Sequence, residues 1–368
     1  MADKNITLRQ KNTSGVYDKL YTKTTATQSK LSTATAELFG DGTSDADTAL
    51  AKIADTVKSI GNVQVKVVDP NGNPIQGARI TGLYGTPTTA SDGTAHGVLQ
   101  TNPISISSPY IDLKDQTADA SGYVGSFNVL TVTLPIVGEN GIIRVTSSKT
   151  VKFSKAVKTV DVCCVGGGGG GGNLIVTSSG GVTYEHVSGG GGGGAIVNSY
   201  AQAPTYNTLY NIVIGGGGST GYTAGKGGTT TFMGVSANGG GGAYVYTGGS
   251  DPRGYGGTEG STGSGRGGGY DGSVGSNTTL SEFNDGVTFY SGGGGYSGGG
   301  GPGSGKGGTP NGANSAYITG GYPGSSTPHS ASTPGIGGGG GGSDFDFQAD
   351  ANLPSAGGPG LVAIRFHF

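Results

Sequence analysis

Runs of pure glycine interrupt the chain repeatedly after residue 165, and they limit what it can fold into. The longer runs are Gly166–Gly172, Gly189–Gly194, Gly215–Gly218, Gly239–Gly242, Gly292–Gly295, Gly298–Gly301 and Gly337–Gly342. Glycine has no side chain to bury, and on folding it loses more backbone entropy than alanine, by about 0.5–1 kcal/mol per residue. Such runs are therefore either disordered or ordered by backbone hydrogen bonds between segments packed closer than side chains would allow.

Glycine-rich tracts are usually flexible linkers, but the segments that flank these runs argue against that interpretation. Apolar residues of strand composition stand at 160–165 before the first run, at 195–197 after the second, at 210–214 before the third, and again at 361–368. A flexible linker does not need strand-forming segments on either side of it. Collagen is excluded because the glycines follow no strict three-residue period. We therefore expect an ordered core.

The structure that suits these runs is polyglycine II, an extended left-handed helix of about three residues per turn without internal hydrogen bonds. Its N–H and C=O groups point outward, so neighbouring segments must satisfy them. Only glycine lets the backbones approach so closely, with weak Cα–H···O contacts in support. At about 3.1 Å per residue, Gly166–Gly172 would span roughly 22 Å. The sequence predicts a mainly β and irregular fold in which packed polyglycine II helices are framed by β-strands.

Composition and charge give no support for a nucleic-acid-binding, membrane-spanning or disulfide-linked protein. The formal net charge of −2 gives no reason to expect binding to nucleic acid or to an acidic membrane surface. No apolar run approaches the length of a membrane span, and the first residues do not form a secretory signal. Cys163 and Cys164 are adjacent in a strand-like segment, where neighbours do not bridge, so no disulfide is expected. We expect a protein made in the cytoplasm that leaves by another route, for example inside an assembled particle.

Three sections differ in character: a polar N-terminal attachment or oligomerisation section at 1–61, a small β-sandwich at 62–135 and a glycine-rich domain at 136–368. In the first section, Ser44 and the acidic residue three positions on form a variant of the capping box. The apolar residues that follow at helical spacing are Ala46, Ala49, Leu50, Ile53, Ala54 and Val57. This pattern predicts an amphipathic helix over 44–59, which packs on its own chain, on copies of itself or on a neighbouring protein.

Strand patterns define the middle section. Val63–Val67 alternates apolar and polar residues, and the turn residues of Asp69–Pro74 lead from it into Ile75–Ile80. This pattern predicts a hairpin. Further strands are expected at Ser121–Val129 and Leu130–Pro135, followed at the start of the glycine-rich domain by Ile142–Thr146 and Lys158–Val165.

The inserts between the glycine runs are rich in Tyr, Ser, Thr and Asn and poor in Leu. They are Asn173–Ser188, Ala195–Ile214, Ala243–Arg266, Tyr270–Ser291 and Asn311–Ile336. Tyrosine offers large contact area at low entropic cost, and Ser, Gly and Asn offer adaptable hydrogen bonds, so this is the composition of binding loops on a rigid scaffold. The alternative is that the tyrosines flank the glycine lattice and seal it from water.

A chain that repeatedly reverses direction places its inserts at two opposite ends of a bundle. One end faces the β-sandwich, because the first run follows Val165 directly, and the other end is free. A simple alternating count of passes puts Asn173–Ser188 at the free end and, if each short run makes one pass, also Ala243–Arg266 or its neighbours. The candidate residues for contact with a partner are Tyr184, His186, Tyr244, Tyr246 and Tyr255.

Motifs for chemistry are absent or weak. Gly300–Lys306 imitates a phosphate-binding loop, but Gly307 stands where a metal-binding Ser or Thr is needed. The four histidines lack metal-ligand spacing. Asp344 and Asp346 leave a calcium site open as a possibility, although an acidic loop beside glycines is more often only solvated. No nucleophile and base are arranged together, so we expect no enzyme, no cofactor and no metal.

The section from about Ile136 to Phe368 resembles the glycine-rich domains at the ends of bacteriophage tail fibres and baseplate proteins. The resemblance rests on the strand 160–165 leading into Gly166–Gly172, on the second run, and on a final strand. It is similar to the distal adhesins of T-even-type long tail fibres, which implies stacked polyglycine II helices with receptor-contacting loops at one end. Two further resemblances are looser. Val65–Ile80 resembles the first hairpin of prealbumin-like or carboxypeptidase-regulatory-like sandwich domains, and Tyr17–Thr24 resembles the N-terminus of phage or prophage tail proteins.

This resemblance implies a receptor-binding protein of a phage tail or phage-like particle, located at the tail tip or baseplate. Its expected partners are a host cell-surface polymer or protein and, through the N-terminal section, other tail proteins and copies of itself, with a homotrimer expected by analogy. No nucleic acid and no membrane insertion are expected. The alternative is a purely structural fibre or baseplate component. A glycan-degrading enzyme is disfavoured for want of a carboxylate pair.

Overall fold

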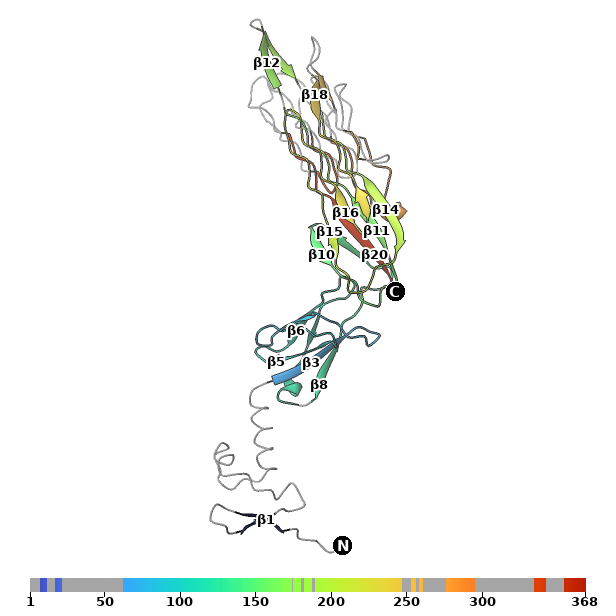
Figure 1. The fold of residues 1–368 in the computed structure, drawn as a ribbon. Helices are drawn as coiled ribbons and strands as arrows, with labels where there is room; N and C mark the ends of the chain where they lie inside the picture. The colour runs from blue at the N-terminus through green and yellow to red at the C-terminus, as the bar shows by residue number, and fades with distance from the viewer. Residues whose placement is uncertain are drawn as a thin grey trace. The chain divides into compact units, whose positions relative to one another are not determined.

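The computed structural model of the 368-residue chain describes residues 7–11, 17–21, 62–126, 128–173, 175–179, 182–186, 189–246, 253–255, 258–260, 276–294, 334–341 and 354–368. The predicted helix over 44–59 lies outside these residues. The chain forms two compact units, one of Met1–Pro109 with Lys114–Pro135 and one of Tyr110–Leu113 with Ile136–Phe368 (Figure 1). The fold is mainly β and irregular, as predicted.

The first unit contains an antiparallel hairpin and two three-stranded sheets that resemble a β-sandwich. The hairpin pairs β1 (Thr7–Lys11) with β2 (Tyr17–Tyr21). One sheet has the order β5 (Thr94–Val98), β3 (Asn62–Val68), β8 (Val129–Thr133), and the other has β4 (Arg79–Thr81), β6 (Ile104–Ser107), β7 (Gln116–Ala118). The apolar residues of β3 alternate as the sequence predicts, since Val63, Val65 and Val67 are fully buried.

Two local predictions in this unit are wrong. The turn after β3 forms, and Asp69 Oδ1 accepts the N–H groups of Asn71 and Asn73 at 2.9 and 2.8 Å. After the turn, Pro74 bridges antiparallel to Val68 at the end of β3, but the pairing stops there and the chain crosses to the other sheet, so β3 and β4 do not pair as the predicted hairpin. The strand predicted over Ser121–Val129 is replaced by the 3₁₀ helix η2 (Ser121–Tyr123) and a turn at Gly125, whose φ is +61°. Only glycine adopts such a φ without strain.

A four-stranded antiparallel sheet forms the base of the second unit. Its order is β14 (Ile196–Gln202), β11 (Thr159–Val165), β20 (Leu361–His367), β9 (Ile142–Val145). Alternate residues of β11 face opposite sides: Val160, Val162 and Cys164 belong to one apolar cluster, while Cys163 and Val165 belong to another. Both faces of the sheet are therefore covered.

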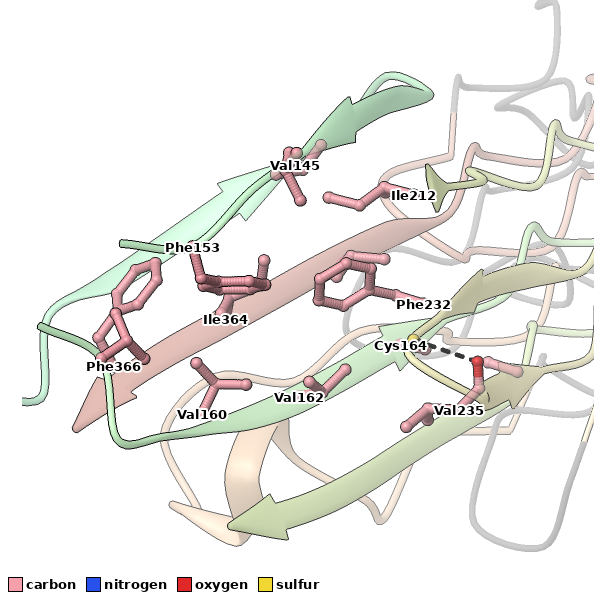
Figure 2. Packing of buried hydrophobic residues seen from close by; sticks show 14 of the residues in the cluster. Val145, Phe153, Val160, Val162, Cys164, Ile212, Phe232, Val235, Ile364 and Phe366 are labelled. Carbon is pink, nitrogen blue, oxygen red and sulfur yellow. Dashed lines mark hydrogen bonds between the residues drawn. The ribbon is translucent and has the colours of Figure 1, made fainter. Parts of the chain in front are cut away.

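The first face is covered by a second layer of short strands. These are β10 (Lys149–Val151), β15 (Tyr210–Ile212), β16 (Thr230–Phe232) and β17 (Val235–Ala237). β10 pairs with β15 and β16 with β17, and Val213 and Thr231 exchange backbone hydrogen bonds between the two pairs. Figure 2 shows Phe153, Phe232, Ile364 and Phe366 between the layers, and all four belong to one buried cluster.

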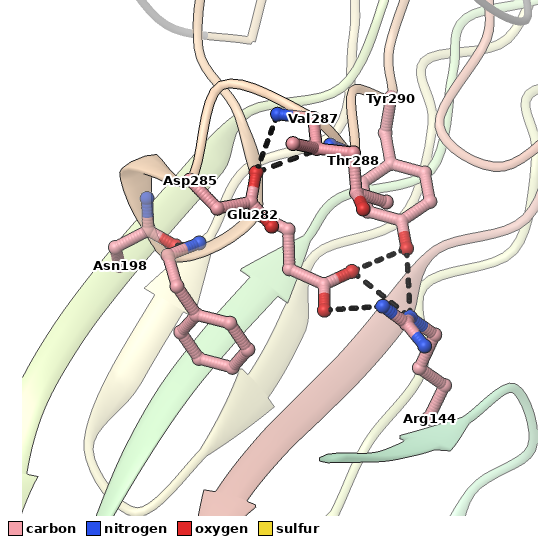
Figure 3. A network of polar contacts seen from close by, with 8 residues as sticks. Arg144, Asn198, Glu282, Asp285, Val287, Thr288 and Tyr290 are labelled. Atoms are coloured by element: carbon pink, nitrogen blue, oxygen red, sulfur yellow. Dashed lines mark hydrogen bonds and ion pairs between the residues drawn. The ribbon is translucent and has the colours of Figure 1, made fainter. Parts of the chain in front are cut away.

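The second face is covered by the segment around η3 (Glu282–Asn284). Phe283 and Tyr290 pack on this side of the sheet. Arg144 on β9 holds the segment through two hydrogen bonds to the fully buried carboxylate of Glu282, at 3.0 and 2.8 Å, and Tyr290 donates to the same carboxylate (Figure 3). The bond to Glu282 raises the pKa of Arg144, and burial, followed by the bond to Glu282, raises the pKa of Tyr290.

The glycine runs leave this base as a hydrogen-bonded lattice, with Gly166–Gly172 at its centre. The N–H of every third residue in this run donates to the same neighbouring segment. The bonds, all 2.8–3.1 Å long, run from Gly166, Gly169 and Gly172 to Ala195, Gly192 and Gly189, from Gly167 and Gly170 to Gly228 and Gly225, and from Gly168 and Gly171 to Gly358 and Ser355. Partner numbers fall as the run's numbers rise, so these three neighbours are antiparallel to it.

The carbonyl groups of the central run face three further segments. Gly167, Gly168, Gly169 and Gly170 accept from Gly240, Gly218, Gly340 and Ala243 at 2.8–3.0 Å. These segments run parallel to the centre, because partner numbers rise with the numbers of the run. Gly167 and Gly170 pair with Gly240 and Ala243, Gly168 and Gly172 with Gly218 and Gly221, and Gly168 and Gly169 face Gly338 and Gly340. A repeat of three residues with all bonds between segments is the pattern of polyglycine II. The predicted lattice is confirmed in the described residues.

The lattice leaves no space for side chains at its centre. A Cβ atom built on each residue from Gly166 to Gly170 would lie 1.9–2.1 Å from a carbonyl oxygen of a parallel neighbour. Real Cβ contacts are essentially never shorter than 3.0 Å. Glycine is required here by the close approach of the backbones, not by φ, which lies outside the left-handed region at these five positions.

Candidate functional site

Two β-hairpins extend from the end of the lattice that lies away from the base sheet. The first, β12 (Ile175–Ser179) with β13 (Val182–His186), follows the central run and precedes the antiparallel run that returns to β14. The second, β18 (Tyr244–Tyr246) with β19 (Arg253–Tyr255), begins after the parallel segment that ends at Ala243. Figure 1 shows β12 and β18 at this end of the unit and β11, β14 and β20 at the other.

Backbone hydrogen bonds join the starts of both hairpins to the turn at 219–225. The N–H of Asn173, just before β12, donates to the carbonyl of Gly221 at 3.0 Å. The N–H of Ala224 donates to the carbonyl of Ala243 at 2.9 Å, and Thr223 forms an antiparallel bridge with Tyr244. The turn therefore ties the start of one hairpin to the start of the other. Both hairpins rise from a single hydrogen-bonded platform.

All five sequence-predicted contact residues lie on these two hairpins. In the second hairpin, Tyr244 is directly opposite Tyr255. Tyr246 is opposite Arg253 in the same hairpin. The remaining two candidates are on β13, where Tyr184 is opposite Thr177 and His186 is opposite Ile175. The structure thus brings Tyr244, Tyr246 and Tyr255 together on one ribbon, and Tyr184 and His186 on the other.

Tyr222 is a further aromatic residue at this end that the sequence reasoning missed. It lies in the turn that joins the two hairpins, and its exposed fraction of 45% is close to the 44% of Tyr244. The sequence did contain a signal for Tyr222: this tyrosine follows Gly221 directly, where the chain reverses between two short glycine segments. Exposed tyrosine gives contact area with little conformational entropy to lose, which makes Tyr222 a candidate contact residue beside Tyr244 at this end.

The described residues contain scattered potential metal ligands and two free thiols. Among them, no group of three or more His, Cys, Asp or Glu side chains could hold a metal ion. Asp344 and Asp346 lie outside the described residues. Burial raises the pKa of Cys164 to about 12, and burial followed by the charge of Glu282 raises that of Cys163, so both free thiols are poor nucleophiles at neutral pH. No helix in the described residues is long and apolar enough to cross a membrane.

Comparison with known proteins supports the assignment of the domain. The model of a family described as a glycine-rich domain matches residues 144–367, which is more than half of the chain. The matched range begins on β9 and ends on β20, so it spans the base sheet and the lattice. The predicted glycine-rich domain is confirmed. No curated protein matches the chain.

Proposed function

This chain belongs to the glycine-rich domain family, and we propose that it is a receptor-binding protein of a phage tail or phage-like particle. In this proposal, it recognises a polymer or protein on the host cell surface without covalent chemistry. The hairpins β12–β13 and β18–β19 make the contact, while the N-terminal section attaches the protein to other tail components and forms a homotrimer.

The observation that carries the proposal is the pair of hairpins on one hydrogen-bonded platform. Flexible loops lose conformational entropy when they become ordered on binding, and this loss lowers the affinity. Loops that are already held by a rigid base lose less. Here the platform is fixed by backbone bonds of 2.9 and 3.0 Å to the turn at 219–225. The lattice beneath it has backbones in direct contact, which leaves little freedom for bending. A rigid scaffold that presents loops rich in Tyr, Ser and Thr is a common recognition design.

The second candidate is a purely structural tail component, and the lattice itself favours it. Segments whose backbones bond to three antiparallel and three parallel neighbours make a stiff rod whether or not its end binds anything. In that case, the tyrosines at the free end would serve only to cover the lattice against water. The two candidates differ in what happens when those tyrosines are removed.

The test uses the purified full chain and cell envelopes from a panel of candidate host strains. Recognition requires saturable binding to some strains and not to others. Tyr244→Ala with Tyr246→Ala should abolish that binding and leave the melting temperature nearly unchanged, because each aromatic anchor contributes about 2 kcal/mol or more. The matched control is Tyr84→Ala, which removes an exposed tyrosine from the first unit.

Two outcomes would reject the recognition proposal. Absence of binding across a panel of strains that the particle infects leaves only the structural role. If the double variant binds normally but melts at a lower temperature, its tyrosines cover the lattice and do not contact a receptor.

A further inference from the structure

A short loop of the second unit, residues 281–291, covers the second face of the base sheet, and we call it the η3 flap. The N–H of Glu282 donates to the carbonyl of Thr288 at 2.7 Å, so the two arms of the loop are joined to each other. Between the arms, the Asp285 carboxylate accepts the N–H groups of Val287 and Thr288 at 2.9 and 3.1 Å (Figure 3). These bonds lie within the flap, so they remain intact if the flap leaves the sheet.

Side chains of β14 hold one edge of the flap by polar contacts. The Asn198 amide accepts the N–H of Phe283 and donates to the carbonyl of Ser281, both at 3.0 Å. Asn284 donates to the hydroxyl of Tyr200 at 2.9 Å. Asn198 is half-buried and Tyr200 is exposed. Water can therefore replace these contacts when the flap moves away, which keeps their net contribution small.

A buried charge pair holds the flap to β9. The Glu282 carboxylate is fully buried, while the Arg144 side chain that pairs with it is 43% exposed. A buried carboxylate is tolerated only while its partners are in place, because removal of one partner leaves an uncompensated charge away from water. In an open flap the same carboxylate is hydrated. The closed position of the flap therefore depends on Arg144 more than the open position does.

Ser291 joins the flap to the glycine run that follows it, and it is strained in the closed position. Its φ of +66° lies in the left-handed region, and its buried hydroxyl has no hydrogen-bond partner among the described residues. A serine keeps such a conformation only where its surroundings impose it. The strain and the unbonded hydroxyl both raise the free energy of the closed flap. A movement at Ser291 relieves both, which makes this residue the expected hinge.

The two adjacent thiols of β11 report separately on the two faces of the sheet. Cys163 lies under the flap, in the cluster that contains Phe283 and Tyr290. Cys164 lies in the opposite cluster, with its sulfur 3.9 Å from the carbonyl oxygen of Val235. Both thiols are fully buried. Movement of the flap alone would expose Cys163 and leave Cys164 covered.

We propose that the η3 flap opens as a unit about Ser291 while the base sheet and the layer on its first face stay folded. Local unfolding of this kind costs less free energy than global unfolding where few contacts tie a segment to the rest. The open state uncovers Val165 and Leu361, which adjoin Gly166 and Gly360, where two glycine segments leave the sheet. The flap is a conformational device that uncovers the root of the lattice from one side. The inference does not depend on the proposed function.

The experiment uses two full-length single-thiol chains: Cys164→Ala keeps Cys163, and Cys163→Ala keeps Cys164. Each chain is treated with iodoacetamide at pH about 8, in urea below the concentration at which circular dichroism shows global unfolding. Each labelling rate is divided by the rate of the same thiol in the unfolded chain. The corrected rate of Cys163 should exceed that of Cys164 at least tenfold, because the flap unfolds locally before the whole unit does.

Removal of the charge partner tests the role of the flap. Arg144→Ala, introduced into both single-thiol chains, leaves Glu282 buried without its cation and so disfavours the closed position. It should accelerate the labelling of Cys163 at least tenfold more and leave the labelling of Cys164 unchanged. The matched control is Arg79→Ala, which removes an exposed arginine from the first unit and should change neither rate.

A milder variant keeps the test decisive if Arg144→Ala does not fold. Tyr200→Phe removes the hydroxyl that accepts from Asn284 and should accelerate the labelling of Cys163 severalfold. Equal corrected rates for Cys163 and Cys164 at every urea concentration overturn the proposal, because global unfolding then exposes both thiols together. So does selective labelling of Cys163 that neither variant accelerates, because the thiol is then reached by a route other than the flap.

Discussion

A single methyl group placed at the centre of the lattice should destabilise the second unit severely. In Gly169→Ala, the new Cβ would lie 1.9 Å from the carbonyl oxygen of Gly241, so the two backbones must separate by about 1 Å before an allowed contact is reached. That separation strains two hydrogen bonds of Gly169, its N–H to Gly192 and its carbonyl from Gly340, both 2.8 Å long.

The magnitude follows from the balance of these effects. Overpacking costs about 1–3 kcal/mol and each weakened hydrogen bond about 0.5–1.5 kcal/mol, while replacing glycine by alanine restores about 0.4–1 kcal/mol through the unfolded chain. The expected net loss in the free energy of unfolding is therefore about 1–6 kcal/mol.

The matched control is Gly216→Ala in another run of the same lattice. A Cβ on Gly216 meets nothing within 4 Å, and its φ is not in the left-handed region, so this variant should be unchanged or stabilised by about 0.4–1 kcal/mol. Urea unfolding of the full chain, monitored by hydrogen exchange in peptides that cover 166–172, gives the change in unfolding free energy for each of the two variants. If the two variants differ by less than about 0.5 kcal/mol, backbone contact is not what requires glycine in these runs.

Three further outcomes are expected. Ser291 has a φ of +66° and a buried hydroxyl that has no hydrogen-bond partner among the described residues, so Ser291→Gly should raise the free energy of unfolding by about 1–2 kcal/mol in urea titrations; a loss would show that the hydroxyl is bonded. Cys163 and Cys164 should not react with a thiol reagent at pH about 8 until the protein unfolds, and rapid labelling of the folded protein would contradict their burial. Burial raises the pKa of Tyr110 and Tyr290 above the ordinary 10.0, so the stability they contribute is complete below that pH and is lost as pH rises above it. Tyr110→Phe should flatten the alkaline fall in melting temperature, and an unchanged slope would rule Tyr110 out as a contributor.

Particular elements show how far sequence reasoning reached in the fold. The strands at 160–165 and 361–368 were predicted from apolar runs, and they are the two central strands β11 and β20 of the base sheet. The hairpin predicted from Asp69–Pro74 formed only at its turn and at the antiparallel bridge between Val68 and Pro74, because Ile80 lies in the other sheet. Turn chemistry fixes where a chain reverses, but the choice between pairing with the preceding strand and crossing to another sheet depends on which sheet buries Ile80.

The candidate site was predictable in part. Residue composition pointed to Tyr244 and Tyr255. It does not show that the two tyrosines stand opposite each other, because that depends on the register of the two strands and not on composition. Tyr222 was overlooked because its turn is short and lies inside a glycine-rich stretch.

The sequence by itself determined that the runs must lie backbone against backbone, because glycine offers no other surface and its N–H and C=O groups need partners. Only the tertiary structure decided which run stands at the centre and which neighbours it has. Glycine runs are chemically identical, so a run such as Gly166–Gly172 carries no local information about its partners. Which runs become neighbours is decided by the base strands on which the runs begin and by the turns between the runs. Together they fix the direction of each segment and its position along the lattice.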